Sequence, residues 1–390
     1  MQSLLCDRRI LFYVPGMDVI NDGVYYSQVF ALARYAVTLG ARCLIAYTSE
    51  KDIEPETFDL EGVKLIRCKW NVKYTPLPFL PRKYHRSTAE ALSKMRNFAP
   101  THIYIRDPFS GLAGLKVAQK IGCKIVFSRR GAGVEKSQRC LKEWLKEILS
   151  CYLVWRIFRK ASHVNVVSNR LLEMERRWFK GNMSVLQCCV MSERQRVLTR
   201  EEREDSRKEL AIAPATKVVA YSGGMSTYQC IDEILGLMKK LRDADNSIEF
   251  LFLTRGQEEL AAKIRKNGLP STCVHAKSCS PLEVTKYLQV ADAAIILRQD
   301  ETVNNVASPV KIAEYLASGL GVIVSPWIGD VKQILGGSSC ALFYDRNTTI
   351  QSVLKFIYGM SDEKRSDARR IVDDCYTYEG NRDVVLSMFN

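Results

Sequence analysis

Residues 308–330 read SPVKIAEYLASGLGVIVSPWIGD, and the fold assignment depends on this stretch. The pattern predicts a helix with Ser308 as its N-cap and Pro309 in its first turn, closed by a glycine. A short apolar strand follows the helix at once. Another apolar strand, Ala293–Leu297, and an asparagine-rich loop precede it. The stretch therefore predicts a strand–helix–strand unit whose helix begins just beyond the end of a strand.

The same alternation of apolar strands and helices runs through the whole chain. A strand at Arg9–Val14 leads through a loop into a helix at Val24–Leu39 and a second strand at Arg42–Tyr47. A fresh series begins with a strand at Lys217–Tyr221. The other strands are predicted at Val63–Arg67, His102–Ile105, Lys124–Phe127, His163–Val167, Ile248–Leu253, Thr272–His275 and Gly321–Val324. Such runs are typical of buried parallel strands, so we expect an α/β protein with two doubly wound domains.

Composition and charge narrow the class of protein. With 47% hydrophobic and 26% charged residues, the 390-residue chain is globular rather than disordered or fibrous. The first 200 residues hold 34 Lys and Arg against 17 Asp and Glu, whereas the remainder holds 23 against 26. The basic half is either a solvated surface or one that meets an anionic partner, such as a membrane, an acidic glycan or nucleic acid.

The thirteen cysteines favour a reducing compartment. They are odd in number and never spaced as CxxC, so free thiols are expected. The N-terminal residues show no apolar core of a secretory signal, and no run of about 18 apolar residues suits a membrane span. We therefore expect a cytoplasmic protein, with peripheral attachment to the inner face of the plasma membrane left open.

The helix predicted after Ser308 offers a site for an anion. Free backbone N–H groups and the positive end of the dipole favour phosphate there. Lys311 lies in the first turn, where a cation is unfavourable unless an anion compensates. Glu314, one turn further on, can accept two hydrogen bonds from a ribose diol. The alternative is a surface helix on which Lys311 and Glu314 form an i,i+3 pair.

The quoted stretch resembles the donor-binding signature of glycosyltransferase family 4. It is close to the SPxKxxEYLAxGxPVI form found in bacterial surface-polysaccharide glycosyltransferases. Weaker resemblances lie in YSGGMSTYQCIDEIL (221–235), DAAIILR (292–298), IYIRDPFSGL (103–112) and VFSRRG (126–131). The resemblance implies the GT-B fold, in which two Rossmann-like domains face each other across a cleft. It implies an N-terminal acceptor domain (1–195), a C-terminal donor domain (196–377) and a last helix (about 378–390) that packs back on the first domain.

Carried over residue by residue, the resemblance implies a donor site in the second domain. Glu314 matches the glutamate that holds the nucleotide ribose, and Ser308 matches the turn that holds the diphosphate. Gly223 and Gly224 match the glycine loop near the donor phosphates. The remaining donor-side candidates, which would neutralise the diphosphate, are Arg255, Arg298 and Lys311.

Several features of the family are absent from the sequence. Val306 stands where the first glutamate of the family's pair is expected, and no acceptor-side histidine is evident. Asp107 follows an apolar strand and is either the base for the acceptor hydroxyl or the cap of the next helix. Arg106 is placed beside it as a catalytic candidate, and Arg130 and the loop with Gly16 are assigned to the acceptor side.

The sequence predicts neither a metal nor a cofactor. The four histidines lack metal-ligand spacing, and Asp243–Ala244–Asp245 matches a DxD pattern only in the wrong domain. A P-loop and a GxGxxG motif are absent. The co-substrate would be a nucleotide-diphosphate sugar of unknown base.

Two segments mix aromatic and basic residues in the way that interfacial sites do. Residues 138–160 repeat aromatic and aliphatic side chains at helical spacing, and residues 67–86 mix Lys and Arg with Trp, Tyr and Phe. The alternative for the first is packing into the domain core.

The function that we predict is a glycosyltransferase acting on a glycan or lipid-linked glycan in surface-polysaccharide assembly, retaining and metal-independent. An epimerase of nucleotide sugars is one alternative. A non-catalytic polyanion- or membrane-binding protein on a degenerate scaffold is another, although no nucleic-acid partner is expected.

Overall fold

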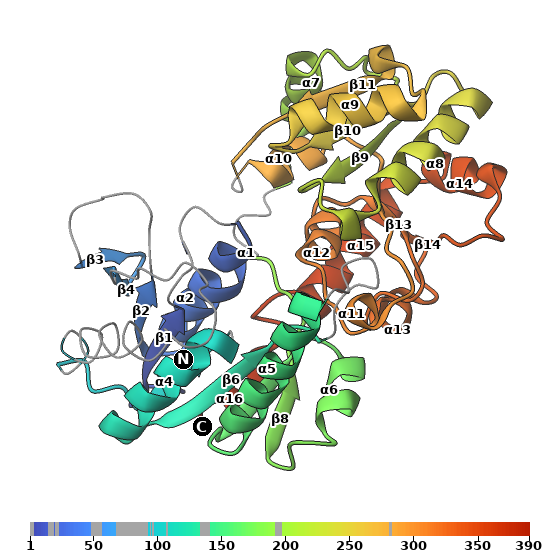
Figure 1. The fold of residues 1–390 in the computed structure, drawn as a ribbon. Coiled ribbons are helices and arrows are strands. Elements are labelled where there is room, and N and C mark those ends of the chain that lie inside the picture. The colour runs from blue at the N-terminus through green and yellow to red at the C-terminus, as the bar shows by residue number, and fades with distance from the viewer. Residues whose placement is uncertain are drawn as a thin grey trace. The chain divides into compact units, whose positions relative to one another are not determined.

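The computed structural model describes residues 4–14, 19, 23–47, 57–67, 93, 95, 97–106, 108–132, 141–191, 197–280 and 283–390. The chain divides into two compact units, Met1–Cys189 with Asn381–Asn390, and Val190–Gly380. Each unit contains one sheet covered by helices (Figure 1). The α/β class predicted from the sequence is confirmed.

The first unit is built on an eight-stranded sheet of order β3-β4-β2-β1-β5-β6-β7-β8. Its strands are β1 Arg9–Val14, β2 Arg42–Tyr47, β3 Thr57–Leu60, β4 Val63–Arg67, β5 His102–Ile105, β6 Lys124–Arg129, β7 His163–Val166 and β8 Asn182–Val185. All neighbouring strands are parallel except β3 and β4. Because parallel strands share an orientation, the residues after β5 and β6 emerge at one edge of the sheet.

The helices of the first unit connect these strands. They are α1 Gly23–Tyr25, α2 Ala31–Thr38, α4 Pro108–Ile121, α5 Leu141–Phe158, α6 Asn169–Glu175 and α16 Arg382–Phe389. Between α1 and α2 the chain forms a π-helical segment, Tyr26–Phe30, so the predicted helix Val24–Leu39 is continuous but not uniformly α-helical. The C-terminal helix α16 packs against β7 and β8, and the ring of Phe389 lies 6.3 Å from that of Phe12.

The second unit contains a six-stranded, all-parallel sheet of order β11-β10-β9-β12-β13-β14. Its strands are β9 Val218–Ser222, β10 Glu249–Leu253, β11 Val274–Lys277, β12 Ala293–Ile296, β13 Gly321–Val324 and β14 Ala341–Phe343. Its α-helices are α7 Arg200–Glu209, α8 Ile231–Ala244, α9 Gln257–Asn267, α10 Val284–Leu288, α11 Thr302–Asn305, α12 Val310–Ala317, α13 Val331–Leu335, α14 Ile350–Tyr358 and α15 Asp362–Cys375.

The second sheet is buried on both faces. Val218 and Ala220 of β9 point into a core shared with α10, α12 and α15, whereas Val219 and Tyr221 point into a core shared with α8, α9 and α14. Successive side chains of a strand point to opposite faces, so a strand covered by helices on both sides must be apolar throughout. This is why the central strands β9, β12 and β13 read as nearly continuous apolar runs.

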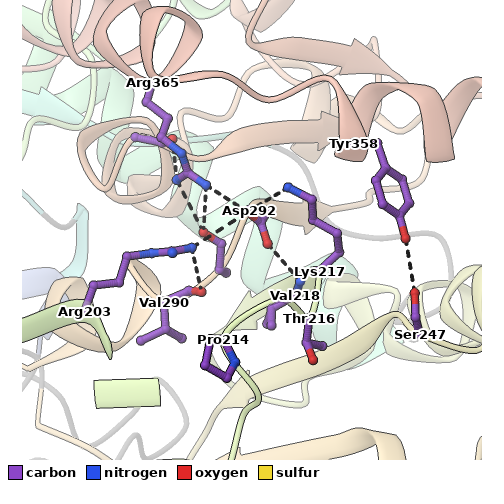
Figure 2. Close-up of polar contacts among 12 residues, drawn as sticks. Arg203, Pro214, Thr216, Lys217, Val218, Ser247, Val290, Asp292, Tyr358 and Arg365 are labelled. Atoms are coloured by element: carbon purple, nitrogen blue, oxygen red, sulfur yellow. Dashed lines mark hydrogen bonds and ion pairs between the residues drawn. The ribbon is translucent and has the colours of Figure 1, made fainter. Parts of the chain in front are cut away.

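A buried carboxylate ties the amino ends of the central strands together. Asp292, directly before β12, accepts a hydrogen bond from the backbone N–H of Val218, the first residue of β9 (3.0 Å). It also pairs with four cations, at distances of 3.0–3.7 Å: Arg365, Lys217, Arg207 and Arg203. Figure 2 shows how Arg203 of α7, Lys217 just before β9 and Arg365 of α15 converge on it. We call this group the Asp292 cluster.

The Asp292 cluster has more cations than carboxylates, and backbone carbonyl oxygens accept hydrogen bonds from these cations. Arg207 is almost fully buried, and its guanidinium donates to the carbonyl oxygen of Val290 and to those of Ala213, Pro214 and Thr216 at 2.8–3.1 Å. Arg203 donates to the carbonyl oxygens of Gln289 and Val290. Every partner is a turn or loop carbonyl near the amino ends of β9 and β12. The cluster therefore closes this edge of the sheet.

Removing the charge of Asp292 should destabilise the second unit strongly. In Asp292→Asn the buried cations keep their desolvation cost and lose their counter-ion, so we expect a loss of about 3 kcal/mol in the free energy of unfolding. Urea denaturation followed by circular dichroism measures it. Asp243→Asn is the matched control, because the exposed Lys239–Asp243 pair contributes about 0.5 kcal/mol or less. Equal effects of the two substitutions would contradict the role assigned to Asp292.

Candidate functional site

The carboxyl edge of the second sheet carries the residues predicted to bind a donor. Gly223 and Gly224 follow β9, Arg255 follows the end of β10, and Arg298 follows the end of β12. Lys311 and Glu314 lie on α12, the helix between β12 and β13. In open parallel sheets ligands bind at this edge. The topology therefore brings the donor-side candidates of the sequence to the same end of one sheet.

Helix α12 begins one residue later than the sequence predicted. Pro309, not Ser308, is its N-cap, with φ −69° and ψ 126°, and no side chain caps the helix. The expectation that Ser308 caps the helix is therefore wrong. The physical reason is the proline, which disfavours the helical conformation at the residue before it. Ser308 stays outside the helix, in the turn that leads into it.

Lys311 is held by neutral groups of its own unit rather than by a carboxylate. Its Nζ donates to the phenolic oxygen of Tyr221 (3.0 Å) and to Oε1 of Gln229 (2.7 Å), and lies 4.4 Å from the centre of the Tyr221 ring. Burial lowers the pKa of Lys311 well below its ordinary value, and the nearby Arg298 lowers it further. Within the described residues, the third N–H of this ammonium has no hydrogen-bond partner. The cation is thus fixed in place with one donor to spare.

The two glycines after β9 differ in their surroundings. Gly223 has φ +130°, and a Cβ placed on it would lie 2.3 Å from Nζ of Lys311. The lysine therefore occupies the space that a side chain at this position would need. At Gly224 a Cβ would meet nothing within 4 Å. The carbonyl oxygen of Gly224 accepts from the hydroxyl of Tyr221 (2.6 Å), which fixes the loop.

Glu314 carries a carboxylate without a partner. No hydrogen bond or ion pair joins its side chain to any residue that the structure describes, so the i,i+3 ion pair with Lys311 does not form. Burial raises the pKa of Glu314, while the charge of Lys311 lowers it. Glu314 and Arg255 both act electrostatically on the thiol of Cys279, which places them in one neighbourhood. A partly buried carboxylate that lacks a donor is suited to accept hydrogen bonds from a ligand.

The two candidate arginines of this edge behave differently. The guanidinium of Arg298 is largely buried, lies 5.1 Å from the centre of the Tyr228 ring and donates to the carbonyl oxygen of Leu297 (3.0 Å). Burial lowers its pKa. Arg255 is exposed in the turn after β10. The guanidinium of Arg298 is thus held in place by its neighbours, whereas the side chain of Arg255 lies in solvent.

Sequence reasoning missed the polar residues that hold the candidates in place. Tyr221 and Gln229 bind Lys311, and the hydroxyl of Tyr315 accepts from the backbone N–H of Ser222 (3.0 Å). At the end of α11, Oδ1 of Asn305 is buried and has no donor among the described residues. Tyr221 and Tyr315 look like core residues in the sequence, because only the fold shows where a tyrosine hydroxyl points. The asparagine-rich loop was the one available signal for Asn305.

In the first unit the structure describes Arg106 and Arg130. Arg106 directly follows β5, and Arg130 directly follows β6, so both lie at the carboxyl edge of this sheet. The side chain of Arg106 packs over the ring of Tyr25 (4.7 Å), and Arg130 donates to the hydroxyl of Tyr104 (3.0 Å). Gly16 and Asp107, the other two candidates of this unit, lie outside the described residues.

Within the described part of the chain, no group of three or more His, Cys, Asp or Glu residues could hold a metal ion. The two aspartates of the DxD pattern have other roles. Asp243 pairs with Lys239 (2.7 Å), and Asp245 accepts from the hydroxyl groups of Ser247 and Tyr358.

A model of a known protein family matches most of the second unit. Residues 202–372 match the model of the family described as glycosyl transferases group 1. The match begins in α7 and ends in α15, so it contains every donor-side candidate. Among curated proteins, none matches the sequence.

Solved structures share the fold along nearly the whole chain. Sucrose-phosphate synthase from Thermosynechococcus elongatus has a TM-score of 0.76 at 15% identity, covering 98% of this chain and 97% of its own. HepE from Anabaena, in complex with UDP, has a TM-score of 0.67 at 12% identity, covering 96% and 98%. WaaG, a glycosyltransferase involved in lipopolysaccharide biosynthesis, has a TM-score of 0.68 at 11% identity, covering 98% and 99%. These likenesses show the GT-B fold that the sequence resemblance implied.

The two glycines allow a matched test of the loop after β9. Gly223→Ala should lower the free energy of unfolding by about 1–3 kcal/mol, because its positive φ is strained for alanine. The new Cβ also displaces Lys311 from Tyr221 and Gln229. Gly224→Ala should change stability by less than about 1 kcal/mol, because it meets open space and needs no positive φ. Urea denaturation compares the two, and a larger cost at Gly224 would refute the packing described.

Proposed function

We propose that this chain is a glycosyltransferase that moves a hexosyl group from a nucleotide-diphosphate sugar to a glycan acceptor. The GT-B fold and the match of the second unit to the group 1 family support the proposal. HepE has been solved with UDP and with UDP-glucose, so uridine is the first base to test. Surface-polysaccharide assembly is the proposed setting, which the likeness to WaaG supports.

The unpaired carboxylate of Glu314 is the observation that carries the donor assignment. Two oxygens on α12, without a hydrogen-bond donor among the described residues, match a ribose diol, which offers two hydroxyl donors. Arg298 and Lys311 stand at the same edge and match the diphosphate. The carboxylate and the two cations together fit the ribose and diphosphate of one nucleotide.

The proposed chemistry needs no metal. As the bond from the sugar to the diphosphate breaks, negative charge grows on the leaving phosphate. Lys311, with a free N–H, and Arg298, held over Tyr228, would stabilise that charge without reorganisation. Arg255 and the amides near Ser308 complete the donor side. The proposed outcome is retention, with the acceptor attacking on the face that the diphosphate leaves.

Donor binding is the direct test, measured by isothermal titration with UDP, GDP, ADP and UDP-glucose. We expect one nucleotide to bind, and Glu314→Gln to weaken it by about 10- to 150-fold. The reason is the loss of charge-assisted hydrogen bonds of about 1.5–3 kcal/mol. Glu258→Gln, an exposed glutamate in the first turn of α9, is the matched control and should leave affinity unchanged.

Two results would count against this assignment. Failure of every nucleotide to bind would remove the donor proposal. Conversion of the sugar nucleotide into an isomer without any acceptor would favour the epimerase alternative.

We further propose that the first unit attaches to an anionic membrane surface through α5 and the turn after α6. The outward face of α5 carries Trp144, Ile148, Tyr152 and Trp155, which are 42–56% exposed, and Trp178 after α6 is 71% exposed. The inward face buries Leu153, Val154, Ile157 and Phe158. The ring of Phe158 contacts that of Phe179 (5.2 Å), so the end of α5 adjoins Trp178. We call the five exposed side chains the aromatic stripe.

Cations surround the aromatic stripe. Arg156 lies over Tyr152 (5.9 Å) and Arg159 over Trp155 (5.0 Å). Further exposed cations are Lys160, Arg176, Arg177 and Lys180. Exposed tryptophans rimmed by Lys and Arg suit the headgroup region of an anionic bilayer, where each cation contributes about 1 kcal/mol. Across the helices that the structure describes, none is long and apolar enough to span a bilayer, so the proposed contact is with the surface.

Co-sedimentation with lipid vesicles tests the attachment. The protein should bind vesicles that contain phosphatidylglycerol more tightly than vesicles of phosphatidylcholine alone. The double substitution Trp144→Ser with Trp155→Ser should lower the partition coefficient at least about tenfold, because each aromatic ring buried contributes about 1.5–3 kcal/mol. Val197→Ser, an exposed apolar residue of the second unit, serves as the control. Binding that ignores both the lipid charge and the tryptophans would rule out the aromatic stripe.

A further inference from the structure

Two arginines at the carboxyl edge of the first sheet lie close together without an acidic partner for Arg106. Arg106 forms no ion pair with any described Asp or Glu, and its Nη1 is buried without a hydrogen-bond acceptor. The charge of Arg130 acts on it directly, and this repulsion, together with burial, lowers the pKa of Arg106. A desolvated cation beside a like charge is costly unless an anion joins them.

Several other buried arginines of the chain pair with a carboxylate. Arg129, the last residue of β6, pairs with the buried Glu175 at 2.9 Å. Arg207 and Arg365 share Asp292. Among the described residues, Arg106 contacts the face of the Tyr25 ring and pairs with no carboxylate. The contrast indicates that its Nη1 is kept for a group that the chain does not provide.

The surroundings of the two arginines are rigidly built. Gln28 is fully buried, donates through Nε2 to the carbonyl oxygen of Cys189 (3.0 Å) and accepts at Oε1 from Arg130 (3.2 Å). Tyr104 is fully buried and accepts from the other terminal nitrogen of Arg130 (3.0 Å). Gln28 and Tyr104, both neutral, therefore orient the guanidinium of Arg130.

A second observation comes from the helix that faces the arginines. Gln28 lies in the π-helical segment Tyr26–Phe30, and Tyr25, which packs against Arg106, immediately precedes it. A π-helical turn within a helix is rare and is frequently found at functional sites. Here the π-helical segment positions the two residues that contact the guanidinium groups, Tyr25 at Arg106 and Gln28 at Arg130. The π-helical segment thus lies where the helix contacts the two arginines.

We propose that Arg106 and Arg130 form an oxyanion site, which binds a phosphate or carboxylate group of the acceptor substrate. Guanidinium groups bind both anions through paired N–H donors. The site lies in the unit that the group 1 family model does not match, which favours the acceptor over the donor as the source of the anion. The proposal rests on the proposed function, because it names the acceptor class as a sugar acid, a sugar phosphate or a phospholipid-linked glycan.

The full-length protein is titrated with inorganic phosphate and with acetate, and the thermal unfolding midpoint is recorded at constant ionic strength against chloride. One of the two oxyanions should raise the midpoint saturably. Arg106→Gln should weaken its apparent dissociation constant about tenfold or more. The matched control is Arg42→Gln, an exposed arginine at the opposite edge of the same sheet, which should bind as the wild type does.

A structural role for Arg106 makes a different prediction. Since its Nη1 has no acceptor among the described residues, Arg106→Gln without added anion should leave the midpoint unchanged or raise it. A fall in the midpoint of this variant, together with unchanged anion binding, would overturn the proposal. Equal binding to wild type and variant would show an adventitious ion only, and no binding of either oxyanion to the wild type would also overturn it.

Titration with UDP separates this site from the donor site. Saturating UDP should leave the apparent affinity for the oxyanion unchanged, and Arg106→Gln should leave UDP affinity unchanged. Competition between UDP and the oxyanion would assign the arginines to the donor diphosphate and overturn the acceptor assignment. A wild type that binds the oxyanion but no nucleotide would refute the donor proposal and leave the oxyanion site standing.

Discussion

The single carboxylate of Asp292 is the constraint on which the second unit depends. It joins the amino ends of β9 and β12 to α7 and α15, and it is the counter-ion of four cations. The polar groups at the amino edge are thus engaged with one another. At the carboxyl edge, among the described residues, Glu314 has no hydrogen-bond or ion-pair partner and Lys311 keeps one N–H without an acceptor. The sheet therefore separates the groups that stabilise the unit from the groups left for chemistry.

Much of the fold could be predicted from the sequence, because buried parallel strands leave long apolar runs. β1, β2, β4, β5 and β13 begin and end at the predicted residues. The sequence did not reveal β3, β8 and β14, which are the outermost strands of their sheets. An edge strand is covered less completely, so NMSV and ALF carry a weaker apolar signal than RILFYV. The π-helical segment was equally hidden, because its apolar spacing still reads as helix.

The site was predictable where chemistry follows position along the chain, and not where it follows side-chain packing. Lys311 and Glu314 were singled out from a helix start after a strand, and both lie there. Their environment was not accessible, because Gln229 and Tyr221 are distant in sequence and meet Lys311 only in the folded unit. The contact between Gly223 and Lys311 was hidden for the same reason. A glycine in a sequence pattern does not show whether the space beside it is occupied by a ligand or by a neighbouring side chain.

The π-helical segment Tyr26–Phe30 has a consequence for how such an enzyme changes over evolutionary time. A π-turn contains one residue more than an α-turn, so the loss of one residue there would restore a regular helix. Each residue of an α-helix turns the chain by about 100°. Such a deletion would rotate Tyr25 away from Arg106 while every residue of the arginine pair stayed the same. If the arginine pair binds the acceptor as proposed, a single-codon insertion or deletion would change substrate preference without altering either arginine.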